Sequence, residues 1–397
     1  MNRPSEGRRR GVSREETVMG ALLLLVPATF VAAAVGAPAW LQFFLSVGSV
    51  IPLAAFIGWA TEALADQLGG KIGGLLNATF GNAPDLMVGI FGVQKGLIPL
   101  VKATLIGALI SNSALIMGVC YIVAGLFYGR PRFKRDEAGH HSVLMMLTVA
   151  AVLFPSVGVF AGVRASSQTI EDISVGIAVV LLLAYVAYVA YVAYVAYGIF
   201  GLESLAGVHS KGRNNPVPPR EEADADGHAW PLWLSVAVLF GAAAALIPIT
   251  NILTDRVQAV TQVLGWSEIF VGIIVVANAG NVAEAYSAIK LAKGKAGTPG
   301  ESPTGDSGLD LALGIASASS IQIATFVAPI VVLYSLFTHP MTLVFSPVEI
   351  AILVLLVVIF TYIAQDGESN WLEGAQLLAL YAMSAILFFA LPASVFG

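Results

Sequence analysis

The sequence predicts an all-α integral membrane protein with about eleven transmembrane helices, arranged as two inverted five-helix repeats after an extra first helix. Three observations predict this fold. The composition is apolar, the apolar residues form stretches of membrane-spanning length, and one short polar motif occurs in both halves of the chain.

The composition excludes an ordinary soluble domain. Of the 397 residues, 57% are hydrophobic and 11% are charged, with a mean hydropathy of +0.83, whereas a soluble domain carries about 25% charged residues. The single cysteine, Cys120, lies inside an apolar stretch. Without a second cysteine the chain forms no internal disulfide and no cysteine-rich metal site.

The apolar stretches are each long enough to cross a hydrocarbon core of about 30 Å at a rise of about 1.5 Å per residue. The first, 17–36, follows an arginine-rich segment but lacks a small-residue cleavage site, so it predicts a retained helix and not a signal peptide. The eleven stretches lie near 17–36, 39–65, 71–94, 100–128, 142–163, 173–200, 231–253, 267–293, 308–336, 346–364 and 371–394.

The distribution of Lys and Arg predicts a cytoplasmic N-terminus. Positively charged residues gather in the cytoplasmic loops of membrane proteins. With the N-terminus inside, only four of the 20 Lys and Arg residues fall outside, namely Lys95, Lys102, Arg164 and Arg256. The same bias favours an odd number of helices, with the C-terminus on the outside.

A hydrophilic segment, 201–230, divides the chain. It is rich in proline and charge, which is typical of a linker. Each side of it then holds five helices, and because five is odd the second set enters the membrane from the opposite face. The predicted regions are a basic cytoplasmic N-terminus (1–16), the extra first helix (17–36), a first repeat (39–200), a cytoplasmic linker (201–230) and a second repeat (231–397).

The polar motif supports the inverted repeat. Residues 81–85 read Gly-Asn-Ala-Pro-Asp, and residues 280–284 read Gly-Asn-Val-Ala-Glu. Each motif is followed by a cluster of small polar residues, at 111–113 in the first half and 317–322 in the second. The two halves therefore place the same chemistry at matching positions.

Asp85 and Glu284 are the candidate cation and proton ligands. An ionisable group at mid-membrane costs about 2.5–3.5 kcal/mol even on lenient scales, so it persists only beside a cavity, a partner or an ion. Asn82 and Asn281 each lie three residues before the acid, on the same helix face. Glycine before each Asn allows close backbone approach or a helix break.

Neutral oxygen donors complete the predicted site. Carboxylates with neutral oxygens, and no histidine or cysteine ligand, suit Ca2+ better than Zn2+. Alternatively, the asparagines and serines are hydrogen-bonding residues between helices. Glu62 is either part of an interfacial charge cluster or an acid at the cavity mouth. The neutral donors are Ser111, Asn112, Ser113, Ser319, Ser320 and Gln322.

These motifs resemble the Ca2+/proton exchanger family of the cation/Ca2+ exchanger superfamily. The similarity covers almost the whole chain after residue 50 and rests on Thr61-Glu62, 71–82, 280–284, 320–324 and 366–374. The resemblance implies an eleven-helix fold that exchanges Ca2+ for protons by alternating access. It also implies an acidic helix in the cytoplasmic linker, where this chain has only a short acidic run at 221–226.

Three positions depart from the family pattern. Asp85 stands where the family carries Glu, Ala277 where it carries Pro, and Ala285 where it carries the His after the acid. All three fall at the predicted site. They therefore bear on cation selectivity and proton coupling and leave the fold unaffected.

We therefore expect a secondary antiporter that exchanges Ca2+ for protons, with Asp85 and Glu284 shared between them. The missing His and the extra Asn278 favour an alternative, a Na+ or K+/proton (or Na+/Ca2+) antiporter on the same scaffold. A channel or a non-transporting sensor is less favoured, because paired carboxylates in inverted repeats argue against a continuous pore. The sequence shows no nucleophile–base group and no nucleotide loop, so an enzyme is not expected.

The expected setting is the inner membrane of a prokaryotic cell, with the lipid bilayer as partner. We expect no cofactor beyond the transported Ca2+ and protons, and no nucleic-acid partner.

Overall fold

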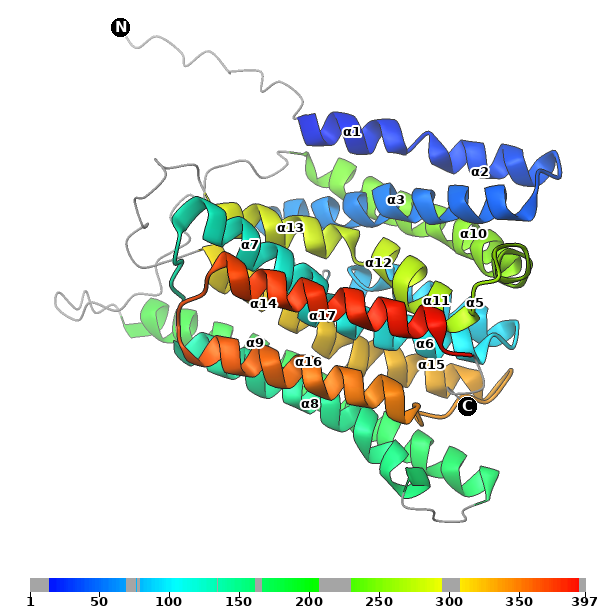
Figure 1. Ribbon diagram of the computed structural model, residues 1–397. Coiled ribbons are helices and arrows are strands. Elements are labelled where there is room, and N and C mark those ends of the chain that lie inside the picture. The colour runs from blue at the N-terminus through cyan, green and yellow to red at the C-terminus, as the bar shows by residue number, and fades with distance from the viewer. Residues whose placement is uncertain are drawn as a thin grey trace, which may run out of the picture.

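The computed structural model describes residues 14–68, 76, 79–133, 135–160, 166–206, 230–294 and 308–392. These residues form a bundle of helices that run roughly parallel to one another (Figure 1). Lys71 and Asn77, which carry part of the family resemblance, lie outside the described residues, as does most of the predicted linker.

The extra first helix has a short break in its middle. It consists of α1 (Arg14–Leu22) and α2 (Leu25–Ala34), and its apolar part, Glu16–Ala34, is long enough to span a membrane. It packs on the next helix at one edge of the bundle (Figure 1). A hydrogen bond of 3.0 Å between the hydroxyls of Thr29 and Ser49 joins the two.

The two halves of the chain contain the same kinds of element in the same order. Each has a long helix, a helix that begins directly after the motif asparagine, a helix interrupted by a wide π-helical turn, and two further helices. The first half comprises α3 (Ala39–Leu68), α5 (Ala83–Gln94), α6 (Ile98–Ile110), η1 (Ser111–Ile116), α7 (Met117–Tyr128), α8 (Arg135–Phe160) and α9 (Ser167–Ala206). The second comprises α10 (Leu232–Leu264), α11 (Glu268–Phe270), η2 (Val271–Val276), α12 (Ala277–Gly280), α13 (Val282–Lys293), α14 (Gly308–Gln322), η3 (Ile323–Val327), α15 (Ala328–Ser335), α16 (Pro347–Gln365) and α17 (Trp371–Ala390).

The all-α membrane fold is confirmed, whereas the count of eleven spans is not. Seven described helices are long and apolar enough to cross a membrane, or eight if the bent pair Glu268–Gly280 and Val282–Lys293 is one span. The expected stretches 142–163 and 346–364 appear as α8 and α16, whose apolar parts are shorter. Helix α9 continues to Ala206, past the predicted start of the linker.

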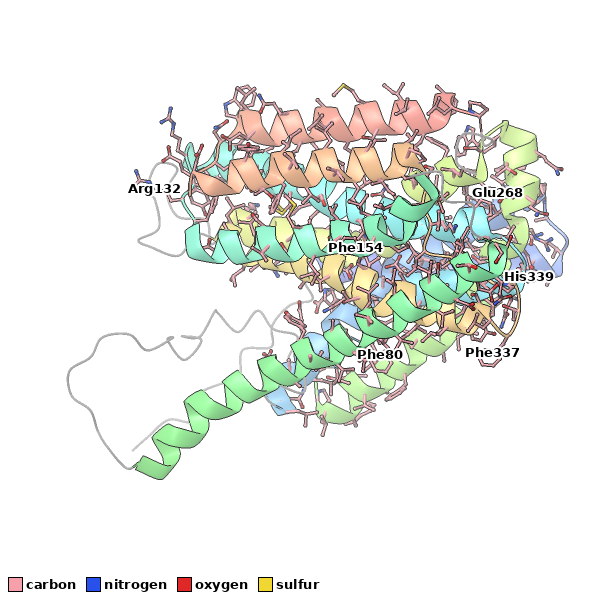
Figure 2. The ribbon with its side chains drawn as sticks, turned by 90° about the horizontal axis from the view of Figure 1, so that it is seen from below. Phe80, Arg132, Phe154, Glu268, Phe337 and His339 are labelled. Carbon is pink, nitrogen blue, oxygen red and sulfur yellow. The ribbon has the colours of Figure 1, made fainter. Side chains whose placement is uncertain are left out.

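The bundle has two distinct ends. Figure 2 shows Arg132 at one end and Glu268, Phe337 and His339 at the other. At the Arg132 end the α7–α8 and α16–α17 connections pair, because Phe133 N–H donates to Gly367 O at 3.0 Å. Arg132 Nε also lies 3.7 Å from Glu368 Oε2.

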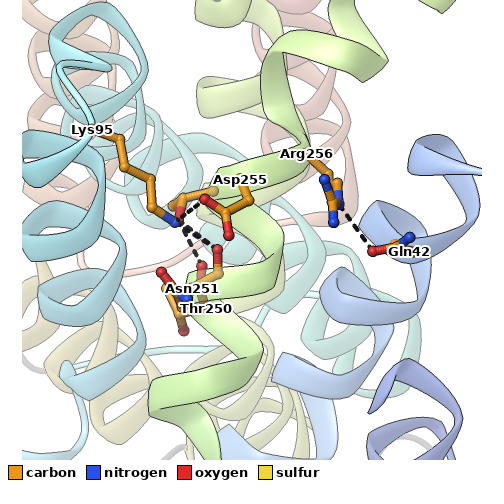
Figure 3. Close-up of polar contacts among 7 residues, drawn as sticks. Gln42, Lys95, Thr250, Asn251, Asp255 and Arg256 are labelled. Carbon is orange, nitrogen blue, oxygen red and sulfur yellow. Dashed lines mark hydrogen bonds and ion pairs between the residues drawn. The ribbon is translucent and has the colours of Figure 1, made fainter. Parts of the chain in front are cut away.

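At the opposite end, Lys95 joins α5 to α10 (Figure 3). Its ammonium lies 2.7 Å from Asp255 Oδ1 and donates to Asn251 O and Thr254 Oγ1, each at 2.7 Å. Burial lowers the pKa of Lys95 below its usual value, while the hydrogen bond and charge of Asp255 oppose this effect. Arg256, which is also on α10, donates from Nε to Gln42 Oε1 on α3 at 2.9 Å.

Backbone contacts at glycines bring the two halves together. A Cβ on Gly107 of α6 would lie 2.5 Å from Ile273 Cα, and a Cβ on Gly272 would lie 2.9 Å from Leu100 O. No side chain fits into either gap. Helix α6 and the η2 segment therefore touch along their backbones, which is how the first repeat reaches the broken helix of the second.

We expect Gly107→Ala to destabilise the protein by about 1–3 kcal/mol, because an added methyl must displace backbone atoms. The matched control is Gly241→Ala in α10, where a Cβ meets nothing within 4 Å. The control should be neutral or stabilising by up to about 1 kcal/mol, since alanine favours helix more than glycine does. Thermal unfolding in detergent measures both variants, and equal apparent melting temperatures would contradict the close α6–η2 contact.

Candidate cation-binding site

The two predicted carboxylates occupy equivalent positions at helix breaks. Helix α5 starts at Ala83, with Asn82 as its N-cap and Asp85 in its first turn. In the second half, the chain bends by 59° between α12 and α13, with Asn281 at the break and Glu284 in the first turn of α13. A helix N-terminus carries partial positive charge, which favours a carboxylate there.

The two breaks lie against each other. A Cβ on Gly280 would lie 3.1 Å from Asp85 Oδ1 and 3.6 Å from Pro84 Cβ, so only glycine leaves room for this approach. Asp85 is buried, with 5% of its surface exposed. The first-repeat acid therefore lies against the helix break that precedes Glu284 in the second repeat.

The two motif asparagines each hold the opposite repeat. Asn82 Nδ2 donates to Gln322 Oε1, at the end of α14, at 2.6 Å. Asn281 Nδ2 donates to Asn112 Oδ1, in η1, at 3.3 Å. Asn112 Nδ2 in turn donates to Ser319 Oγ at 3.1 Å. Each motif asparagine thus donates a hydrogen bond from its amide nitrogen to the other repeat. Its amide oxygen accepts no hydrogen bond from a described residue.

Four side-chain oxygens of the predicted site residues are buried and have no hydrogen-bond partner among the described residues. Such atoms are rare in folded proteins, since an unsatisfied buried polar atom costs about 1–3 kcal/mol. Oxygens of these types are also the ligands that a hard cation takes. The four oxygens are Asn82 Oδ1, Asn281 Oδ1, Glu284 Oε2 and Ser320 Oγ.

Other predicted donors have different contacts. Ser113 Oγ donates to Leu109 O of its own helix at 2.7 Å, and Ser317 Oγ donates to Leu313 O at 2.8 Å. Both hydroxyls therefore satisfy the local backbone. Ser111 Oγ donates to Asn278 Oδ1 at 2.8 Å, so it contacts a residue that is not among the predicted ligands.

Glu62 lies apart from the buried oxygens. Its side chain is exposed on α3, one turn after Gly58, where a Cβ would lie 3.8 Å from Ala283 Cβ. Glu62 is therefore on the helix that covers the α12–α13 break, but its own position is at the surface. A role at the cavity mouth stays a prediction.

Two features of the site had no clear sequence signal. The serine and asparagine cluster of the first half forms η1, and Gln322 directly precedes η3. Such π-helical turns often occur at functional sites, but local propensity does not encode them. Tyr381 of α17 also contacts Asn278, at 2.6 Å, from a helix with no predicted site residue.

The arrangement suits a hard cation. The region offers two carboxylates and neutral amide and hydroxyl oxygens, the ligand types that Ca2+ prefers. In the part of the chain that the structure describes, no group of three or more His, Cys, Asp or Glu side chains is placed to hold a metal ion. The chemistry is therefore that of a mixed oxygen site with two acids and neutral donors.

Comparison with known proteins places these features in context. The chain matches the family described as sodium/calcium exchanger protein over residues 38–194 and 234–390. It is 36% identical to the Ca2+/H+ antiporter ChaA of Bacillus subtilis (strain 168) over 92% of this chain and 97% of that one. It is 34% identical to a Ca2+/H+ antiporter of Synechocystis over 97% of this chain and 100% of that one.

Solved structures show the same fold. A structure of the Ca2+/H+ antiporter protein YfkE has a TM-score of 0.74 and 31% identity over 94% of this chain and 100% of that chain. The H+/Ca2+ exchanger CAX has a TM-score of 0.67 at 14% identity, covering 95% of this chain and 93% of that one. The second likeness concerns the fold alone.

The Asn82–Gln322 bond predicts a coupling between two residues 240 positions apart. Asn82→Ala and Gln322→Ala should each destabilise the protein, by roughly 1 kcal/mol for a lost hydrogen bond plus the cost of the unsatisfied partner. The double variant should be no less stable than the worse single variant, because both remove one bond. Apparent melting temperatures of the four proteins measure this cycle, and fully additive losses would disprove the bond.

Proposed function

The chain belongs to the sodium/calcium exchanger family, as its motifs predicted, and we propose that it is a secondary antiporter that exchanges Ca2+ for protons. The multi-pass membrane setting follows from the family and from the apolar helices. Its named bacterial and cyanobacterial relatives are Ca2+/H+ antiporters. Those relatives are transporters, in keeping with the expectation of a protein that is not an enzyme.

The observation that carries the proposal is the set of buried oxygens without partners beside two carboxylates. We infer that Asp85 and Glu284 bind Ca2+ directly, together with the amide oxygens of Asn82 and Asn281 and the hydroxyl of Ser320. Ca2+ takes six to eight oxygen ligands in flexible geometry, which leaves room for water. Asn112 and Gln322 hold the two amides, so that their oxygens face the ion.

Proton coupling follows from the charge of the empty site. Two carboxylates close together in a low-dielectric region cannot both stay ionised without a counter-ion. Ca2+ neutralises them when it is bound, and protons neutralise them when it has left. Cation and protons therefore compete for the same two acids, and no separate proton pathway is needed.

Alternating access is supported by the symmetry of the site. The ligands come from both repeats, at breaks that lie against each other, so a rocking movement of one repeat would open the site to one side or the other. In this proposal the end of the bundle that carries Lys95 faces outside and the Arg132 end faces the cytoplasm. The membrane would be the inner membrane of a prokaryotic cell.

The contacts of Asn278 bear on the monovalent alternative. Asn278, which favoured a Na+ or K+ site, uses its amide nitrogen for Ile274 O and Tyr381 Oη and accepts from Ser111 with its oxygen. The absence of the family's histidine at Ala285 still favours it. Uptake of radioactive Ca2+ into proteoliposomes with an imposed pH gradient, scanned against Na+, K+, Mg2+ and Mn2+, separates the two functions.

We expect Glu284→Gln and Asp85→Asn to abolish Ca2+/H+ exchange, because one carboxylate alone cannot balance a divalent ion in a buried site. The same proteoliposome assay measures both variants, with protein yield and gel-filtration profile as controls for folding. Retention of half the wild-type rate or more in either variant would remove that residue from the site.

Asp85→Glu is the matched charge-conserving variant. It adds one methylene, which extends the carboxylate by roughly 1–1.5 Å and restores the family's residue. We expect exchange to persist with a lower Ca2+ concentration at half-maximal rate. Complete inactivity would show that charge alone at this position is not sufficient. Loss of Ca2+ exchange with intact Na+/H+ exchange in Asp85→Asn would favour the monovalent alternative.

The orientation is tested by single cysteines, since Cys120 is buried. Ser210→Cys, in the predicted cytoplasmic linker and outside the described residues, should react with a membrane-impermeant thiol reagent only after permeabilisation. Thr338→Cys, exposed at the other end of the bundle, should react in intact cells. The reverse pattern would mean that the N-terminus is outside.

A further inference from the structure

Asn278 makes three side-chain hydrogen bonds near the proposed site, yet the proposed ligand set does not include it. It lies in α12, three residues before the break at Asn281. Its Nδ2 donates to Ile274 O at 2.7 Å and to Tyr381 Oη at 2.6 Å. Its Oδ1 accepts from Ser111 Oγ at 2.8 Å. Both amide hydrogens and the amide oxygen are therefore used.

These contacts join three separate parts of the fold. Ile274 belongs to η2, directly before α12, so this bond holds the side chain to its own helix. Ser111 is the first residue of η1 in the first repeat, and Tyr381 lies in the middle of α17 near the end of the chain. Asn278 thus gives α17 a polar contact with the helix that leads to the proposed cation site.

The Ser111–Asn278 bond lies beside a second bond between the same two segments. The residue after Ser111 is Asn112, whose Oδ1 accepts from Asn281 Nδ2 at 3.3 Å. Two neighbouring bonds therefore hold the side chains of the α12 region against η1. The same region carries Asn281, whose Oδ1 is a proposed ligand, and Gly280, which lies against Asp85.

We propose that Asn278, held by Ser111 and Tyr381, is a positioning residue that sets the cation affinity of the site from α17. This inference rests on the proposed function, because it takes the region around Asp85 and Glu284 as the cation site. It also gives Ser111 a role other than the one expected from sequence. Ser111 directs Asn278 and does not itself bind the ion.

The test compares full-length wild type with Tyr381→Phe, which removes one hydroxyl and leaves the ring. Exchange is measured in proteoliposomes over a series of Ca2+ concentrations. Loss of one buried hydrogen bond should raise the KM for Ca2+ about three- to tenfold, with the maximal rate changed by less than about twofold, because a positioning residue acts on binding. Ser111→Ala should act in the same direction.

Two matched controls should leave KM unchanged. Tyr362→Phe removes a hydroxyl from an exposed tyrosine of α16, whose side chain is 68% exposed. Ser384→Ala removes a hydroxyl of α17 that donates only to Leu380 O of its own helix. A rise in KM in the controls as large as in Tyr381→Phe would overturn the proposal, because the effect would then not depend on Asn278.

The decisive measurement is the dependence of these effects on Asn278. In an Asn278→Leu background, Tyr381→Phe should raise KM no further, because both act through one side chain. A full additional effect in that background would overturn the proposal, as would a Tyr381→Phe protein with wild-type KM and only a lower melting temperature. If wild type exchanges another cation and not Ca2+, the proposed function fails; the same comparison, made with that cation, then judges the positioning role separately.

Discussion

Two negative charges in one buried region are the constraint on which the rest of the site depends. Asp85 lies against the helix break that precedes Glu284, and placing one such acid at mid-membrane costs about 2.5–3.5 kcal/mol even on lenient scales. The first turn of a helix offers each about 0.3–1 kcal/mol in return, or about 2 kcal/mol in a favourable buried geometry. The helix termini therefore do not stabilise two ionised acids, and the remaining charge has to be met by a cation or by protons.

The amide side chains beside the two acids connect the repeats. Each motif asparagine donates its amide hydrogen to the opposite repeat, Asn82 to Gln322 and Asn281 to Asn112. The amide oxygens of the proposed site are therefore held by contacts between the repeats. In the proposed mechanism, a shift of one repeat along the other would break these bonds and so change the ligand set. Ion binding and repeat position would be linked for this reason.

The sequence predicted the parts of this arrangement that depend on local pattern. Gly280 before Asn281 indicated a break or a close approach, and the structure has both, with a 59° bend and Asp85 against the glycine. The contacts of Asn278 with Ser111 and Tyr381 were not predictable, because they join residues more than 100 positions apart that share no motif. The π-helical turns were missed for a similar reason, since packing against neighbouring helices decides which carbonyl each N–H meets. The number of spans stays a prediction.

The proposed site lies close to the Lys95 end of the bundle, because helix α5 runs from one to the other. Helix α5 carries Asp85 in its first turn and is followed directly by Lys95, so roughly 15 Å along the helix axis separates the backbone positions of these two residues. The ammonium contacts of Lys95 with Asp255, Asn251 and Thr254 all lie on α10 (Figure 3). If α10 moves away from α5 to open that end, this partly buried ammonium must lose or exchange its partners. A ligand can shift such an equilibrium only by its differential affinity for the two states. In the proposed mechanism, loss of the Lys95 contacts is therefore one cost that a difference in cation affinity between the open and closed forms has to offset.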